Sequence, residues 1–127
     1  MKIKRSIVAI TGAAGGLGAA MAKRLAKQGA RLALIDFNPD KLDELNKNLG
    51  LPSEDVLLVP CDVSNESQVD KAFEAIAGHF GGLDLLVNNA GITRDALMLK
   101  FKDGQRQSRM SLSDWNAVIN VNLTGVF

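Results

Sequence analysis

The chain has 127 residues, which is about one domain, and its 46% hydrophobic and 23% charged residues are typical of an ordinary globular protein. The net charge of +1 gives no overall field that would attract nucleic acid or an anionic membrane, and no apolar run approaches the roughly 20 residues of a membrane span. The single cysteine and single histidine argue against an internal disulfide or a metal site. We therefore expect a cytoplasmic protein with no metal and no nucleic-acid or membrane partner.

Four short apolar runs, at residues 6–11, 31–36, 55–60 and 84–89, predict strands. Each is apolar on both faces, as in a parallel sheet that is covered on both sides. The segments between them predict three helices, at 16–28, from the Asn38-Pro39 cap onward, and from Ser64 or Asn65 to the glycines at 81–82. In the first helix we expect four residues to face the core: Leu17, Ala20, Met21 and Leu25.

The alternation of strands and helices, joined by short loops, predicts the fold class. It indicates an α/β fold, a Rossmann-type doubly wound parallel sheet with right-handed crossovers. The residues 1–127 would supply its first four strands with their flanking helices.

A glycine-rich stretch, TGAAGGLG at 11–18, falls where the first strand turns into the first helix. Its glycines at 12, 16 and 18 do not have the G-x-G-x-x-G spacing. The same physics applies, because missing Cβ atoms allow a tight turn and a helix N-terminus offers free N–H groups to a pyrophosphate. The alternative is a tight turn with no ligand.

Asp36 closes the second predicted strand, 18 residues after Gly18. A carboxylate at this place can accept hydrogen bonds from the ribose hydroxyls of an adenosine and would repel a 2′-phosphate. The alternative is a cap for the next helix, although Asn38 is better placed for that. The ribose interpretation is the one we favour.

Four motifs occur in order along the chain: TGAAGGLG at 11–18, CDV at 61–63, NNAG at 88–91 and VNLTGVF at 121–127. With these motifs the chain resembles the N-terminal half of a short-chain dehydrogenase/reductase, nearest to the 3-oxoacyl-acyl-carrier-protein reductases. The resemblance covers essentially the whole chain.

The resemblance implies a set of cofactor-binding residues: Gly12, Ala14, Gly15, Gly16, Leu17, Gly18, Asp36, Phe37, Asp62, Val63, Asn89, Ala90 and Gly91. It assigns Asn88 to tying the fourth strand to its neighbours, and Asn122 to the asparagine of the catalytic tetrad, which holds a relay water. Gly15 and Phe37 stand where many NADP-using relatives have basic residues. These departures favour NAD over NADP.

The resemblance also implies an activity, hydride transfer between NAD(H) and a carbonyl or secondary alcohol. Acyl thioesters, hydroxy acids, sugars and steroids stay open as substrates, with 3-oxoacyl thioesters favoured, and a homodimer or homotetramer is expected. The family's serine and Tyr-x-x-x-Lys are not among residues 1–127, and the last residues stand inside a predicted helix. We therefore expect half of an enzyme, inactive alone; the alternative is a non-catalytic nucleotide-binding module.

Residues 97–110 are longer than relatives need between NNAG and the next helix, and they predict an inserted β-hairpin. Asp103-Gly104 is a two-residue type I′ turn signal, and apolar and basic residues alternate before it. We expect this hairpin at the cofactor mouth or at a subunit contact. The alternative is a mobile basic loop.

The last predicted helix begins at Ser111 or Ser113 and has an apolar stripe that starts at Trp115. At 100° per residue, Asn122 falls in the centre of this stripe. A carboxamide there costs about 1–3 kcal/mol unless it is hydrogen-bonded, so we expect a partner such as the fourth strand or a water. Replacement by leucine would then keep or raise stability.

Overall fold

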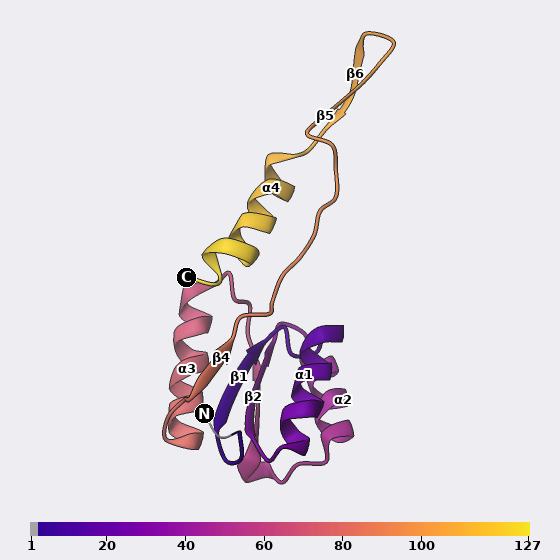
Figure 1. Ribbon diagram of the computed structural model, residues 1–127. Coiled ribbons are helices and arrows are strands. Elements are labelled where there is room, and N and C mark those ends of the chain that lie inside the picture. The colour runs from indigo at the N-terminus through magenta and orange to yellow at the C-terminus, as the bar shows by residue number, and fades with distance from the viewer. Residues whose placement is uncertain (1–2) are drawn as a thin grey trace. The chain divides into compact units, whose positions relative to one another are not determined.

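The computed structural model describes residues 3–127, which form two compact units (Figure 1). The first extends to Ala90, and the second comprises Gly91–Phe127. Within the described residues, no helix combines the length and the apolar character needed to cross a membrane.

The first unit is built on a four-stranded parallel sheet. Its strands are β1 (Ile7–Thr11), β2 (Arg31–Asp36), β3 (Val56–Pro60) and β4 (Leu85–Val87). They lie in the order β3-β2-β1-β4, and Ile10 pairs with Leu34 on one side and with Val87 on the other. This confirms the predicted doubly wound parallel sheet. The chain passes from β3, at one edge of the sheet, to β4, at the other edge beside β1.

Three helices connect these strands: α1 (Gly16–Lys27), α2 (Pro39–Leu49) and α3 (Glu66–Phe80). The predicted caps are confirmed, since Asn38 Oδ1 accepts from the Lys41 N–H and Asn65 Oδ1 accepts from the Gln68 N–H, both at 3.1 Å. A single 3-10 turn, η1 (Ser53–Asp55), precedes β3.

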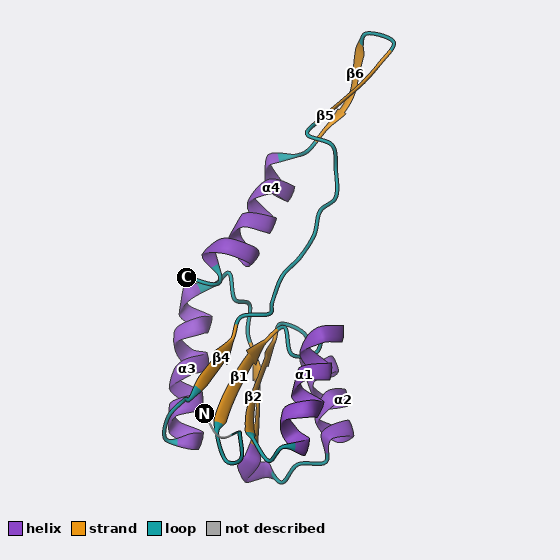
Figure 2. Ribbon diagram, viewed as in Figure 1, coloured by secondary structure: helices purple, strands orange, loops and turns teal. Residues whose placement is uncertain are grey.

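The helices cover the two faces of the sheet, with α1 and α2 on one side and α3 on the other (Figure 2). Alternate residues of β1 divide between the two cores, because successive side chains of a strand point to opposite faces. Val8 and Ile10 pack with α1 and α2, whereas Ile7 and Ala9 pack with α3. The sheet is thereby packed between two apolar cores.

The expected core face of α1 is partly wrong. Leu17 is 76% exposed and Ala20 is also exposed, while Gly18 and Ala22 are the buried positions. The physical reason is the close approach of Gly18 to the turn after β1, where an added Cβ would lie 2.2 Å from the Gly12 carbonyl oxygen. Only a glycine fits against that backbone, so Gly18 sets the rotation of the helix and Leu17 turns outward.

The second unit contains a two-stranded antiparallel hairpin, β5 (Leu99–Lys102) and β6 (Gln105–Arg109), in the segment where the sequence predicts one. Asp103 and Gly104 have φ angles of 53° and 72°, as a type I′ turn requires. The register of the strand pairing shifts between Lys100 and Phe101, which leaves a β-bulge on β6.

The last helix differs from the continuous α-helix that the sequence predicts. The helix α4 (Leu112–Ile119) begins after its expected cap, as Ser111 Oγ accepts from the Asp114 N–H at 3.0 Å. It then continues into a π-helical turn, η2 (Asn120–Thr124), closed by the Gly125 N–H on the Asn120 carbonyl at 2.8 Å. The wider turn breaks the 100° spacing on which the predicted apolar stripe depends.

Candidate functional site

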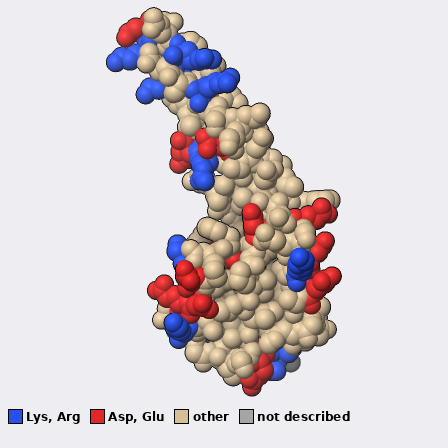
Figure 3. All heavy atoms as spheres, turned by 180° about the vertical axis from the view of Figure 1, so that it is seen from behind, with Lys and Arg blue, Asp and Glu red and all other residues tan. Residues whose placement is uncertain are grey.

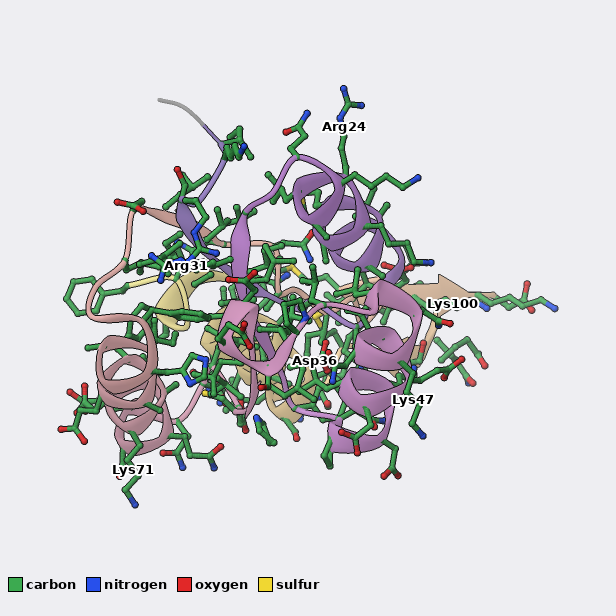
Figure 4. All side chains as sticks on the ribbon, turned by 90° about the horizontal axis from the view of Figure 1, so that it is seen from below. Arg24, Arg31, Asp36, Lys47, Lys71 and Lys100 are labelled. Carbon is green, nitrogen blue, oxygen red and sulfur yellow. The ribbon has the colours of Figure 1, made fainter. Side chains whose placement is uncertain are left out.

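The candidate cofactor residues of the first unit follow the strands at the carboxyl edge of the sheet. In a parallel sheet these strand ends share one edge, which is where open α/β sheets bind ligands. The glycine turn follows β1, Asp36 ends β2, Asp62 follows β3, and Asn89 follows β4. Figure 4 shows Asp36 enclosed by the strands and helices, whereas Arg24 and Lys71 lie at the periphery.

The glycine turn is tightly held by main-chain bonds. The Ala13 N–H donates to the Ile35 carbonyl at 3.0 Å, and the Gly15 N–H donates to the Gly12 carbonyl at 3.2 Å. Gly12 has a φ of +63°, and a Cβ there would lie 2.9 Å from Ala90 Cα. The turn is therefore packed directly against the segment after β4.

The N-terminus of α1 is open toward solvent. Its cap residue is Gly15, which has no side chain to bond the first N–H groups, and the first turn has no acidic residue. No acceptor among the described residues takes the N–H groups of Gly16, Leu17 or Gly18. A Cβ added at Gly16 would meet nothing within 4 Å. These donors, the positive end of the helix dipole and the open space beside Gly16 suit an anionic phosphate group.

Asp36 is buried, with 8% of its surface exposed, and both of its carboxylate oxygens are engaged. Oδ2 accepts from the Ala14 N–H at 3.0 Å, and Oδ1 accepts from the Asn38 N–H at 3.1 Å. The carboxylate thus joins the end of β2 to the glycine turn. Each oxygen has a second lone pair that can accept another hydrogen bond. Phe37 beside it is 75% exposed.

Asn89 fixes the segment after β4 to the end of β1. Its Nδ2 group donates to the Thr11 and Gly12 carbonyls, each at 3.1 Å. The tying role expected for Asn88 is therefore wrong, because Asn88 is exposed and the amide of its neighbour makes these bonds. The inward side chain at this point is set by the pleat of β4, which a one-residue shift would reverse.

Thr11 is a residue of this site that sequence reasoning missed. Its buried Oγ1 accepts from the N–H groups of Asn89 and Ala90, both at 3.0 Å. A polar residue at the end of an otherwise apolar strand was the only available signal. The hydroxyl holds the turn after β4 in register with the glycine turn.

The Thr11 hydroxyl gives a direct prediction for stability. In Thr11→Val the shape is kept but two N–H groups lose their acceptor, so the free energy of unfolding should fall by about 2 kcal/mol. Urea denaturation of the whole protein measures this, and Thr11→Ser, which retains the hydroxyl, is the matched control. An equal loss in the two variants would mean that methyl packing, and not the hydroxyl, stabilises this turn.

After β3, Asp62 and its neighbours form a local hydrogen-bonded turn. Asp62 Oδ1 accepts from the Ser64 N–H at 2.9 Å, and the Asp62 N–H donates to Gln68 Oε1 at 2.8 Å. Asp62 is exposed and Val63 is half-buried. Cys61 is buried, and burial, helped by the Asp62 carboxylate, raises the pKa of its thiol. A thiol that stays protonated is a poor nucleophile, so Cys61 has a packing role.

Asn122 lies in the second unit, where its side chain is bonded to a single residue. Its Oδ1 accepts from the Ile92 N–H at 2.8 Å, and its Nδ2 donates to the Ile92 carbonyl at 2.9 Å. The expected hydrogen-bond partner is thus present, but it belongs to the loop after β4 and not to the strand. Gly91 lies beside this contact, since a Cβ there would be 3.5 Å from Asn122 Oδ1.

The expected burial of Asn122 is wrong. Asn122 is exposed, and so is Trp115 at the start of the predicted stripe. The unit Gly91–Phe127 contains only a hairpin and one helix with its π turn, so it has no second layer to cover this face.

The π turn leaves the main-chain carbonyl of Asn122 without a donor among the described residues. The three N–H groups that follow η2 bond elsewhere: Gly125 to Asn120, Val126 to Leu123, and Phe127 to Leu123 and Thr124. The side chain of Asn122 is occupied by Ile92, whereas its carbonyl can accept a hydrogen bond.

The structure therefore brings most of the candidate residues together in the first unit and places the others in the second. The glycine turn, Asp36, Asn89 and Ala90 are joined by the contacts given above, and Gly91 lies with Asn122. Among residues 3–127 no group of three His, Cys, Asp or Glu side chains could hold a metal ion.

Comparison with known proteins identifies relatives along the whole chain. The family model described as short chain dehydrogenase matches residues 6–127. The 3-oxoacyl-[acyl-carrier-protein] reductase FabG of Thermotoga maritima is 40% identical over 100% of this chain and 48% of its own length.

Solved structures that are 32% identical in sequence also match the fold. A short-chain dehydrogenase/reductase described as glucose/ribitol dehydrogenase, from Brucella melitensis, has a TM-score of 0.88 and 32% identity, covering 100% of this chain and 49% of its own. The 3-ketoacyl-(acyl-carrier-protein) reductase of Brucella melitensis, complexed with NADH, has a TM-score of 0.80 and 32% identity, covering 98% and 47%. The chain spans about half the length of the curated relatives it matches.

Proposed function

The chain belongs to the short-chain dehydrogenase family, and from this premise we propose that the whole protein transfers hydride between NAD(H) and a carbonyl or secondary alcohol. Residues 1–127 would supply the cofactor-binding part. The observation that carries this proposal is the open N-terminus of α1, with its unpaired N–H groups, beside the buried Asp36 carboxylate.

The residues at the carboxyl edge fit a dinucleotide. The N–H groups of Gly16, Leu17 and Gly18 would hold the pyrophosphate, and Asp36 would accept from the adenosine ribose. Asp62 and Val63 would flank the adenine, and the segment Asn89–Gly91 would line the nicotinamide side. The bound nicotinamide supplies or accepts the hydride.

The preference for NAD over NADP follows from the charge of Asp36. A 2′-phosphate would face this carboxylate, whereas a ribose hydroxyl would donate to it, and a hydrogen bond to a charged group is worth about 1.5–3 kcal/mol. Titration of the whole protein should therefore show NAD binding about 10- to 100-fold tighter than NADP.

Replacement of Asp36 by Asn should reduce the ratio of NAD affinity to NADP affinity. Asp40→Asn makes the same charge change at an exposed position of α2 and should leave this ratio unchanged. Equal affinity of the unaltered protein for the two cofactors would contradict the role of Asp36.

On the substrate side we assign two tasks to Asn122. Its amide holds Ile92, and so fixes the loop after β4 to the last helix. Its free carbonyl would hold the water of a proton relay, in place of the side chain that the sequence suggested.

The substrate class is a carbonyl compound such as a 3-oxoacyl thioester, as the names of several relatives suggest. Oxidation of NADH by the whole protein with an acetoacetyl thioester, followed at about 340 nm, tests the activity. Binding of NAD without turnover on any carbonyl would favour the alternative, a nucleotide-binding module. We expect residues 1–127 alone to be inactive.

A further inference from the structure

The β5–β6 hairpin concentrates positive charge that the cofactor site does not use. Between Leu99 and Arg109 there are four cations and one anion, so the hairpin has a net charge of +3 in a chain of net +1. The remaining residues are consequently net −2. Figure 3 shows Lys and Arg side chains gathered over this hairpin. None of its four cations forms an ion pair within residues 3–127.

The same hairpin exposes large apolar side chains on one face. Cross-strand partners share a face, and the register pairs Leu99 with Arg109 and Phe101 with Arg106. Leu99 is 54% exposed and Phe101 is 61% exposed. We call these four residues the Arg–Phe face; the opposite face presents Lys100 and Lys102. An arginine pair beside exposed apolar groups is typical of a contact surface.

A complementary surface exists on α3. Glu66, Asp70 and Glu74 follow one another at intervals of four residues and are all exposed, so they form an acidic row along one side of the helix. The row ends at the exposed small residues Ala77 and Gly78. No member of the row has an ion-pair partner within the described residues.

The spacings of the two surfaces match. Carboxylates four residues apart on a helix are separated by about 6 Å along its axis. Arg106 and Arg109 are three residues apart on β6, but the bulge places them opposite Phe101 and Leu99, which are alternate residues of β5 and therefore about 7 Å apart. The type I′ turn favours the hairpin conformation before any contact, which lowers the conformational entropy lost on binding.

We infer that the hairpin of one copy docks along α3 of a second copy. Arg106 and Arg109 bind the acidic row, and Leu99 and Phe101, which lie opposite them on β5, pack beside the row on the surface of α3. The inference is independent of the cofactor proposal.

Charge reversal with mixing tests this contact in the whole protein. One variant reverses the hairpin, Arg106→Glu with Arg109→Glu, and the other reverses the helix, Asp70→Arg with Glu74→Arg. Sedimentation velocity should show that each variant alone associates about tenfold more weakly than the unaltered protein. An equimolar mixture should associate as the unaltered protein does, because each reversed hairpin then meets a reversed helix.

The matched control is Lys100→Glu with Lys102→Glu, which changes the charge equally on the opposite face and should have a smaller effect. Salt at about 1 M, where the Debye length is about 3 Å, should weaken the association. Unchanged association of both variants would overturn the inference. So would weakening by the hairpin variant alone, or a mixture that associates no better than its components.

Discussion

Replacement of Gly18 by Ala should destabilise the protein by about 3 kcal/mol, although only one methyl group is added. The new Cβ would lie 2.2 Å from the Gly12 carbonyl oxygen and 2.8 Å from Ala13 Cα. Both neighbours are backbone atoms of a turn that is bonded to β2, so neither can move without breaking those bonds. Chemical denaturation of the whole protein measures the loss, and failure to fold would be its extreme form.

The matched variant is Gly16→Ala, two residues earlier in the same helix. Nothing lies within 4 Å of its added Cβ, and Ala restricts the unfolded chain more than Gly does, so stability should be kept or slightly raised. The methyl group would nevertheless stand in the space assigned to the pyrophosphate, and NAD affinity should fall about tenfold. Unaltered NAD affinity in Gly16→Ala would contradict the phosphate site, whereas unaltered stability in Gly18→Ala would contradict the packing argument.

The strands, caps and hairpin turn could be predicted because their signals are local. Asn38 and Asn65 cap helices through bonds to residues three positions away, and Asp103-Gly104 determines its own turn. The outward position of Leu17 could not be predicted, since it results from the contact of Gly18 with Gly12 across the turn.

The misassigned and missed features of the site depend on contacts that are distant in sequence. Thr11 acts through residues 78 and 79 positions away, and nothing near Thr11 indicates them. Whether Asn88 or Asn89 ties the segment after β4 to β1 depends on which of the two side chains points toward β1. That orientation is set by the register of β4 against β1. The π turn accompanies a bond between Asn122 and a residue 30 positions away, whereas periodicity alone predicts a regular helix.

Replacement of Asn122 by Leu should lower turnover of the whole protein by about two orders of magnitude. The structure changes the expected effect on stability. A buried, poorly bonded carboxamide would be replaced by Leu at no cost, but Asn122 is exposed and makes two bonds with Ile92, at 2.8 and 2.9 Å. Their loss should cost about 1–2 kcal/mol and free the loop after β4.

Steady-state kinetics and thermal unfolding of the same preparation separate the two effects. Asn116→Leu, the same chemical change at an exposed position of α4, is the matched control and should alter neither turnover nor stability appreciably. Asn122→Asp retains the acceptor for the Ile92 N–H but loses the donor to the Ile92 carbonyl, so it should fall between Asn122→Leu and the unaltered protein. The proton relay is assigned to the main-chain carbonyl of Asn122, which the Asn122→Leu substitution retains. The loss of turnover in this variant would therefore come from displacement of η2 once the two bonds to Ile92 are gone. Full turnover in a destabilised Asn122→Leu would therefore leave Asn122 with a structural role only.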